Sequence, residues 1–366
     1  MRIGYQLLFQ NGHQGMSDGE MTKKELRLAE LAEPLGFDTL WCVEHHFDDY
    51  SMCPDNTQLL SYLAGRTQRI HLGSAAVILP WNDPLRVAEK VSLIDHLCDG
   101  RFLFGMGRGL ARMEYNGFRV DMGEARGRFN EASKMILAAL ESGFIEGDGP
   151  YYKQPRTEIR PHPGRSFKGR IYAVAMSPES APITAELGAR MMFFVQYPIA
   201  QHLPGVESYR QHYLAHHRVA APPVLTTDFV CCDRDAGKAE AQARRYIAGY
   251  FLSVVRHYEF MGEHFGKAKG YEAYANAAEM LRQAGQEAAT EAFVDAQSWG
   301  TPQQILDKLE RRRATIGDFE LNAITSFAGL PFEDAERNLR LFAEKVAPEI
   351  RSWNADSFEE PARALA

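Results

Sequence analysis

Short runs of β-branched and aromatic residues alternate along the chain with longer stretches whose apolar positions recur at helical spacing. This alternation is typical of β/α units, in which a parallel strand is followed by a helix that covers the sheet. The pattern repeats eight times. The strands are expected at 2–8, 38–43, 70–79, 101–106, 170–175, 189–195, 223–231 and 319–326.

The helices between these strands have recognisable boundaries. An apolar stripe ends at Gly36, and Asp83 with Pro84 forms an N-cap and first-turn pair. Thr301 and Gln304 have the spacing of a capping box. The apolar stripes on these helices are most simply explained as the core of the protein.

Such an alternation suits either a doubly wound sheet or a closed barrel. Chemically unusual residues follow the second, third and fourth expected strands. A barrel gathers the carboxyl ends of its strands on one face, where its active site forms. We therefore predict an α/β fold, a (β/α)8 TIM barrel.

Two stretches interrupt the rhythm, and we predict insertions near 145–168 and 235–300 at the carboxyl-terminal face of a single domain over 1–366. Long insertions at a barrel mouth often act as lids. Simple helix packing explains the aromatic content of the second insertion at least as well. Its aromatic residues include Tyr250, Phe251, His257, Tyr258, Phe260 and Phe265.

Length and composition fit a large globular domain. The 366 residues, 45% of them hydrophobic, suffice for a barrel of ~250 residues with insertions. Lys and Arg number 41 against 48 Asp and Glu, so the net charge of −7 gives no long-range attraction for nucleic acid or anionic membranes. We expect neither as a partner.

The cysteines indicate a reducing environment. There are five, an odd number without a C-x-x-C spacing, and they are expected to be reduced thiols. The start of the sequence lacks the pattern of a signal peptide, and no apolar run approaches the ~20 residues that span a bilayer. We therefore expect a cytoplasmic protein.

The segment 44–49, Glu-His-His-Phe-Asp-Asp, follows the second strand directly. It suits a general acid/base histidine or a metal cluster, and a hydrogen-bonded loop explains it equally well. Adjacent His45 and His46 point to opposite sides of an extended chain, and no H-x-H or H-E-x-x-H spacing brings two imidazoles together. We therefore predict no metal site.

Glycines surround Arg108 at the end of the fourth strand, in the segment 100–109. Glycines let the backbone approach a ligand and a guanidinium fits a phosphate, so a phosphate clamp is plausible; a bulged strand end with a surface arginine is about as plausible. The third glycine is misplaced for a dinucleotide fingerprint. The third strand, 73–80, is by itself a plain core strand.

Taken together, these segments resemble the bacterial luciferase-like flavin-dependent monooxygenases, in particular the luciferase α subunit and its relatives. They occur in the same order and at similar spacing, and the likeness continues more weakly to 300–302 and the final helix. The matching segments are 44–47, 73–80, 83–95, 100–110 and 121–126.

The resemblance implies a flavin site on the expected barrel face. His45 corresponds to the family's catalytic histidine, and Glu44 lies at the floor of the site. Ala75 and Ala76 match the pair that backs the isoalloxazine ring through a cis peptide. These positions stand directly after the second strand and within the third.

The same resemblance implies where the cofactor phosphate binds. Arg108 matches the main phosphate-binding arginine, and Arg126 matches a second one at the start of the next helix. Ser177 and Ser180, after the fifth strand, resemble hydroxyl residues at the phosphate.

Three positions depart from the light-emitting enzymes. Met176 stands where they have glutamate, Val195 where they have a tryptophan beside the flavin, and Gly107 where they have a reactive cysteine. The flavin edge and substrate pocket are therefore changed, and the chain is not expected to be a luciferase.

The activity implied is an FMNH2-dependent monooxygenase that activates O2 through a flavin C4a-(hydro)peroxide and oxygenates a small hydrophobic organic substrate. No nicotinamide-binding motif is present, so a separate flavin reductase is expected to supply reduced FMN. A homodimer, or a heterodimer with a related subunit, is the expected assembly. The alternatives are a deazaflavin (F420)-dependent oxidoreductase, a non-catalytic flavin-binding subunit and a metal-dependent barrel hydrolase.

Overall fold

In a computed structural model, which describes residues 1–353, eight parallel strands close into a barrel. Each strand pairs with the next in the order given below, and the last pairs back with the first. This confirms the predicted (β/α)8 barrel, and every expected strand overlaps an observed one. The strands are β1 (Ile3–Leu7), β2 (Thr39–Cys42), β3 (His71–Ser74), β5 (Phe102–Gly107), β8 (Ile171–Val174), β9 (Arg190–Phe194), β10 (Val224–Cys232) and β12 (Phe319–Ile324).

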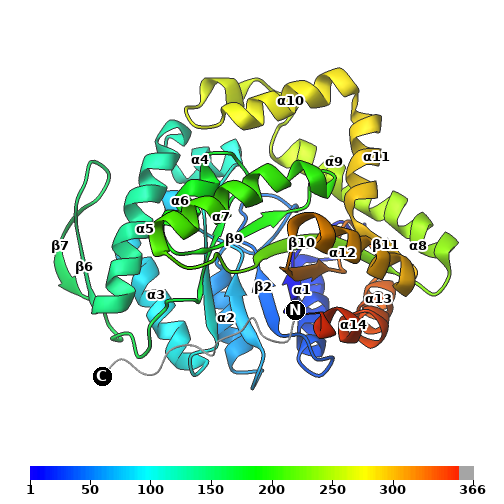
Figure 1. The fold of residues 1–366 in the computed structure, drawn as a ribbon, viewed down its shortest axis with the longest axis horizontal. Helices are drawn as coiled ribbons and strands as arrows, with labels where there is room; N and C mark the ends of the chain where they lie inside the picture. Colours follow the sequence, from blue (N-terminus) through cyan, green and yellow to red (C-terminus); the bar gives the residue numbers. More distant parts are fainter. Residues whose placement is uncertain (354–366) are drawn as a thin grey trace.

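Helices surround the barrel on its outside (Figure 1). They lie between successive strands and their apolar faces bury the outer side of the sheet. The outer ring consists of α1 (Asp18–Ala32), α2 (Asn56–Ala64), α3 (Pro84–Leu97), α5 (Ala125–Ser142), α6 (Ser180–Glu186), α7 (Leu203–His217), α12 (Pro302–Ile316), α13 (Phe332–Lys345) and α14 (Ala347–Ser352). The short helix α4 (Arg112–Phe118) lies instead at the mouth, where Tyr115 packs with the second insertion.

The expected helix boundaries are present. Asp83 caps α3, its carboxylate accepting a hydrogen bond from the backbone N–H of Arg86 at 3.1 Å. Thr301 and Gln304 form the capping box of α12, each side chain bonding to the other's backbone N–H. Both devices satisfy N–H groups that a helix leaves unpaired in its first turn.

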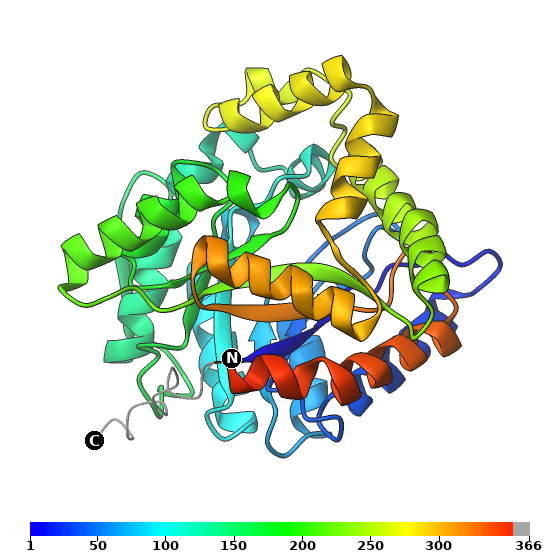
Figure 2. The ribbon, with the colours of Figure 1, turned by 45° about the vertical axis from the view of Figure 1, so that its right-hand side comes forward.

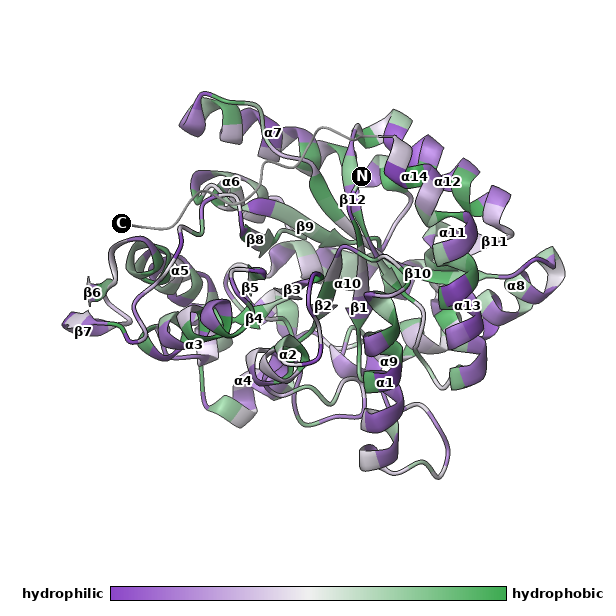
Figure 3. Ribbon diagram, turned by 90° about the horizontal axis from the view of Figure 1, so that it is seen from below, coloured by the Kyte–Doolittle hydropathy of each residue, from purple (hydrophilic) through white to green (hydrophobic). Residues whose placement is uncertain are grey.

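The inside of the barrel is filled by side chains. Trp41 of β2 packs edge-on against Tyr172 of β8, with ring centroids 4.9 Å apart. A Cβ atom on Gly73 of β3 would lie 2.2 Å from the Trp41 ring, so glycine is required there. Figure 3 shows apolar positions concentrated on the central strands. The filled interior forms a floor beneath the carboxyl ends of the strands.

The first insertion forms an antiparallel hairpin of β6 (Phe144–Asp148) and β7 (Lys153–Glu158). It follows α5 and precedes β8, so it joins the barrel at the end where the strands begin. Glu131 of α5 accepts the backbone N–H of Tyr151 at 3.1 Å and pins the hairpin alongside that helix. This position differs from the expected one at the mouth.

The second insertion crosses the barrel mouth as an arch (Figures 1 and 2). Its aromatic side chains, Tyr250 and Phe265 among them, are buried together with Tyr50 and Tyr115 from the loops that follow β2 and β5. The insertion thus has its own apolar contact with the mouth. Its elements are α8 (Ala236–Gln242), a π-helical turn (Ala243–Ile247), α9 (Ala248–His257), α10 (Glu272–Ala284), α11 (Gln286–Ala296) and β11 (Ser298–Gly300).

The cysteines are all buried and free. Cys42 and Cys53 are neighbours, with Sγ atoms 3.4 Å apart. Within residues 1–353, none of the helices combines the length and the apolar character that a membrane crossing requires.

A buried ion pair connects α3 to the end of the barrel where the strands begin. Arg170, just before β8, donates to both carboxylate oxygens of Asp95 at 2.5 and 3.2 Å. The same guanidinium donates to the backbone carbonyl of Ser166 at 2.8 Å. Both charged side chains are at least 95% buried, at 2% and 5% exposure, so neither has water as an alternative partner.

Asp95→Asn should lower the free energy of unfolding by about 3 to 5 kcal/mol, because it leaves the Arg170 charge buried without its carboxylate. Urea denaturation at neutral pH measures this difference. Glu30→Gln is the matched control, since it breaks an exposed pair with Arg66 and should change stability only slightly. Equal losses from the two substitutions would contradict the assignment.

Candidate functional site

The residues expected to form the site follow the carboxyl ends of barrel strands, except that Arg126 and Ser180 lie in the first turns of α5 and α6. Apart from Glu44, Ala75 and Ala76, they belong to two groups. The first, which we call the histidine cluster, is His45 with two residues from elsewhere in the chain, Glu114 and His257. The second, the arginine cluster, consists of Arg108, Arg126, Ser177 and Ser180.

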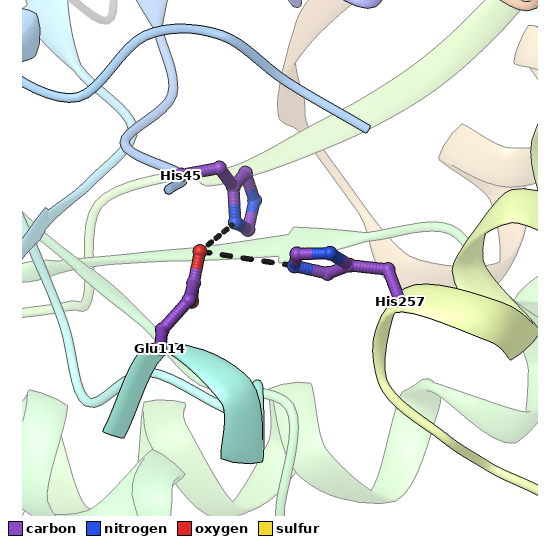
Figure 4. A group of neighbouring side chains, drawn as sticks. All are labelled: His45, Glu114 and His257. Atoms are coloured by element: carbon purple, nitrogen blue, oxygen red, sulfur yellow. Dashed lines mark hydrogen bonds and ion pairs between the residues drawn. The ribbon is translucent and has the colours of Figure 1, made fainter. Parts of the chain in front are cut away.

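The histidine cluster is centred on one carboxylate oxygen, Oε1 of Glu114 (Figure 4). His45 Nδ1 lies 3.0 Å from this oxygen, and the backbone N–H of His46 donates to it at 2.9 Å. His257 Nε2 lies 3.7 Å away on another side. Three segments therefore meet here: the loop after β2, helix α4, and the end of α9 in the second insertion.

Side chains around the cluster fix the two imidazoles. Asp48 Oδ2 lies 3.2 Å from Nδ1 of His257, and the Tyr258 hydroxyl lies 3.5 Å from Nε2 of His45. The Tyr50 ring stacks on the His257 ring, with centroids 4.3 Å apart and planes 14° apart. Burial raises the pKa of the Tyr258 hydroxyl well above its ordinary value, so this group stays protonated.

The charge of Glu114 determines the hydrogen bonding of the cluster. Burial is the largest single influence and opposes ionisation, but the charges and hydrogen bonds of His45 and His257 outweigh it and lower the pKa of Glu114 to about 2. The carboxylate is therefore ionised at neutral pH and only accepts hydrogen bonds. His45 Nδ1 must then be the donor, which leaves Nε2 as the nitrogen that can take up or release a proton.

Glu44 is held against the wall of the barrel. Its carboxylate accepts hydrogen bonds from the backbone N–H of Ile78 at 3.1 Å, the indole N–H of Trp81 at 2.7 Å and the amide of Asn82 at 3.0 Å. His46 Nε2 lies 3.4 Å from it, so the His46 ring contacts a different carboxylate from the His45 ring, which contacts Glu114. These contacts position the segment after β3, and a catalytic role for Glu44 stays a prediction.

The peptide bond between Ala75 and Ala76 is cis, as predicted. The backbone N–H of Ala75 donates to the carbonyl of Cys42 at 2.7 Å, which ties this turn to the end of β2. Gly107 faces it from β5, and a Cβ atom there would lie 3.3 Å from Cβ of Ala76 and 2.8 Å from Cδ1 of Ile78. A cysteine at position 107 would therefore crowd this wall.

The arginine cluster brings two guanidinium groups to the ends of β5 and β8. Arg126 Nη2 donates to the hydroxyl of Ser180 at 3.0 Å, and the Ser177 and Ser180 hydroxyl oxygens are 2.8 Å apart. Arg108 Nη1 donates to the backbone carbonyl of Gly270 in the second insertion at 2.6 Å. Its guanidinium also lies over the Tyr271 ring, 3.9 Å from the centroid.

The electrostatics of this cluster favour an anion. Burial, followed by the charge of Arg108, lowers the pKa of Arg126 to about 10. Within residues 1–353, neither arginine has an ion pair with a carboxylate, although Glu179 lies close enough to influence Arg126. The buried Arg108, the half-buried Arg126 and two hydroxyls match the charge and hydrogen-bonding groups of a phosphate. The residues thus fit the phosphate of FMN.

Sequence reasoning missed several residues of the site. Glu114 lies between the matching segments 100–110 and 121–126, and it carries no local motif. His257 and Tyr258 were considered only as aromatic lid material. Gly270 and Tyr271, which contact Arg108, were not singled out at all. The only available signal was the unusual aromatic content of the insertion that carries four of these five residues.

Comparison with known proteins identifies a family whose model the sequence matches. Residues 1–318 match the family model described as luciferase-like monooxygenase. The chain is 28% identical over 257 residues to the alkanal monooxygenase alpha chain of Photorhabdus luminescens, which covers 70% of this chain and 71% of that one.

Solved structures share the fold. The monooxygenase RslO1 from Streptomyces bottropensis is 25% identical with a TM-score of 0.74, covering 95% of this chain and 99% of that one. The FMN-bound oxygenating constituent of 3,6-diketocamphane monooxygenase from Pseudomonas putida has the same TM-score and coverage at 16% identity. The F420-dependent tetrahydromethanopterin reductase from Methanopyrus kandleri has a TM-score of 0.66 at 20% identity, covering 95% and 99%.

Replacing both His45 and His257 by asparagine should raise the pKa of Glu114 from about 2 to above its ordinary value of 4.5, because burial then loses its main opposition. Since the folded-state pKa is the lower one in the native chain, the carboxylate stabilises the fold above pH 4.5, and this contribution is lost as the pH falls toward 2.

Carbon-13 NMR of the glutamate carboxyl groups, with Glu114→Gln to assign the signal, measures this pKa directly. A carboxyl that titrates as low in the double variant as in the native chain would show that the histidines do not hold the charge.

Proposed function

Because the chain belongs to the luciferase-like monooxygenase family, we propose that it is an FMNH2-dependent monooxygenase that transfers one oxygen atom of O2 to a small hydrophobic organic substrate. The observation that carries the proposal is the arginine cluster beside the catalytic histidine. Arg108 and Arg126 supply two cations for one phosphate, with the Ser177 and Ser180 hydroxyls next to them. When bound, reduced FMN supplies the two electrons that activate O2.

His45 moves the proton in this proposal. Glu114 accepts from Nδ1 and so leaves Nε2 available toward the reacting oxygen. The Tyr258 hydroxyl, 3.5 Å from Nε2, orients the ring from the other side. Glu114 and Tyr258 thus act as positioning residues, while His45 alone transfers the proton.

The second insertion excludes water from the site. Phe260, Phe265 and Tyr271 are buried in the apolar cluster that the insertion forms over the mouth. A dry site keeps activated oxygen from being released as peroxide before the substrate reacts. The same apolar lining suits a hydrophobic substrate.

The assembly and location remain part of the proposal. A separate flavin reductase supplies FMNH2, and the chain works as a homodimer or as a heterodimer with a related subunit. The five buried free thiols suit a reducing compartment, which supports the cytoplasm. The domain over 1–366 serves a single site, to which its second insertion contributes.

Two alternatives are separated by experiment. The fold also occurs in an F420-dependent reductase, but the Glu-His-His motif at 44–46 favours FMN; comparing the binding of FMNH2 with that of F420 decides between them. A non-catalytic subunit would have no use for the paired His45 and Glu114. Turnover by the purified chain with an added flavin reductase excludes it.

Arg108→Ala should weaken FMNH2 binding by about 10- to 100-fold, the effect of losing one charge-assisted phosphate contact. Binding of riboflavin, which has no phosphate, should change less than about threefold. Anaerobic fluorescence titration of both ligands measures the difference. Arg86→Ala, on the exposed face of α3, is the control and should change neither. Equal losses for both ligands would remove Arg108 from the phosphate site.

His45→Ala should leave FMNH2 affinity within about threefold but reduce coupled product formation by about a hundredfold, with oxygen diverted to peroxide. His46→Ala is the matched neighbour and should do less, since its ring contacts Glu44 behind the site. The product-to-peroxide ratio, measured with saturating FMNH2, checks both variants. A larger defect in the His46 variant would mean that the wrong histidine carries the proton.

A further inference from the structure

The histidine cluster has the form of a three-ligand metal site. Nδ1 of His45, Oε1 of Glu114 and Nε2 of His257 lie within 4.8 Å of one another (Figure 4). His45 Nδ1 and His257 Nε2 are 3.0 and 3.7 Å from the carboxylate oxygen. Nitrogen–zinc bonds of roughly 2.0–2.1 Å in a tetrahedral site put ligand atoms about 3.4 Å apart. The two observed separations bracket that value.

The burial of His257 is a second observation, independent of the ligand spacing, that supports a metal site. Its side chain is fully buried, at 0% exposure, and Nε2 has no hydrogen-bond partner in the described chain. A buried imidazole nitrogen whose nearest partner, Oε1 of Glu114, lies 3.7 Å away is costly, because it has lost water and gained a contact that is longer than a hydrogen bond. This nitrogen points toward Glu114 (Figure 4). A cation held between them would satisfy it.

The surrounding groups match the outer shell of a metal site. Histidines that bind a metal through one ring nitrogen usually engage a carboxylate, carbonyl or water with the other. Asp48 engages Nδ1 of His257 at 3.2 Å, and Tyr258 lies 3.5 Å from Nε2 of His45. Both rings are therefore oriented with their remaining nitrogens toward the cluster centre.

We propose that His45, Glu114 and His257 bind one divalent transition metal, with Zn²⁺ as the best-matched ion. Two imidazoles and one carboxylate favour zinc and its first-row neighbours over Ca²⁺ and Mg²⁺, which require oxygen ligands. Three protein ligands leave a further position open to water or a small molecule. The sequence-based prediction of no metal site missed this group because its members are 69 and 143 residues apart along the chain, between positions 45, 114 and 257.

The metal inhibits the enzyme. A metal on Nδ1 of His45 takes the place of the 3.0 Å contact through which Glu114 positions the His45 ring, so the ring is no longer held for proton transfer. The binding itself is independent of the proposed monooxygenase function, and only the inhibition rests on it.

The test is a zinc titration of the full-length chain, free of affinity tags and stripped of metal and flavin. Competition with a chromogenic zinc chelator should give one zinc per chain. His257→Ala should weaken binding by about a hundredfold or more, and Asp48→Asn, which retains every ligand, by about 10- to 100-fold. His264→Ala is the matched control, a buried histidine of the same insertion outside the cluster, and should change nothing.

Several results would overturn the site. Absence of binding at high micromolar zinc would do so, as would equal affinity in the native chain and in a His257→Ala variant whose melting curve shows it folded. Cobalt substitution gives a second readout: an intense thiolate charge-transfer band would assign the metal to the buried cysteines instead. Zinc that binds through His257 but leaves product formation unchanged would confirm the metal site and contradict the inhibition. The failure of the inhibition can therefore be distinguished from the failure of the metal site.

Discussion

One buried negative charge, the carboxylate of Glu114, organises the mouth of this barrel. A carboxylate removed from water is stable only when donors surround it. Here the donors come from the loop after β2, which supplies the His45 ring and the His46 backbone N–H, and His257 of the second insertion approaches the same oxygen. The buried charge of Glu114 must be compensated by these groups. This requirement positions helix α4, the loop after β2 and the insertion relative to one another.

The same helix connects the two clusters. Tyr115, next to Glu114, donates from its hydroxyl to the backbone carbonyl of Arg108 at 2.5 Å. Tyr271 of the insertion donates in turn to the Tyr115 hydroxyl at 3.1 Å. A displacement of α4 would therefore affect His45 and Arg108 together. Such networks tend to rigidify a site when every member is satisfied.

Sequence reasoning recovered what depends on local signals. The strands follow from short β-branched and aromatic runs, and the caps at Asp83 and Thr301 follow from side chains that bond within their own turn. His45 and Arg108 were placed because each lies directly after a strand, and parallel strands end on one face. The partners of these residues could not be found in this way. Glu114 and His257 meet His45 only because α4 and the insertion fold over the mouth, and no local pattern encodes that meeting.

The barrel and the insertion consequently contribute different properties to the site. The barrel strands supply the groups that recur in the family motifs, and their positions are fixed by the closed sheet. The insertion supplies His257 and Tyr258 around the histidine cluster, and Gly270 and Tyr271 around Arg108. Because loops and insertions vary more readily than barrel strands, changes in this segment would alter the surroundings of both His45 and Arg108 while the barrel strands keep these two residues in place. The two residues and the insertion side chains around them are thus encoded in separate parts of the sequence.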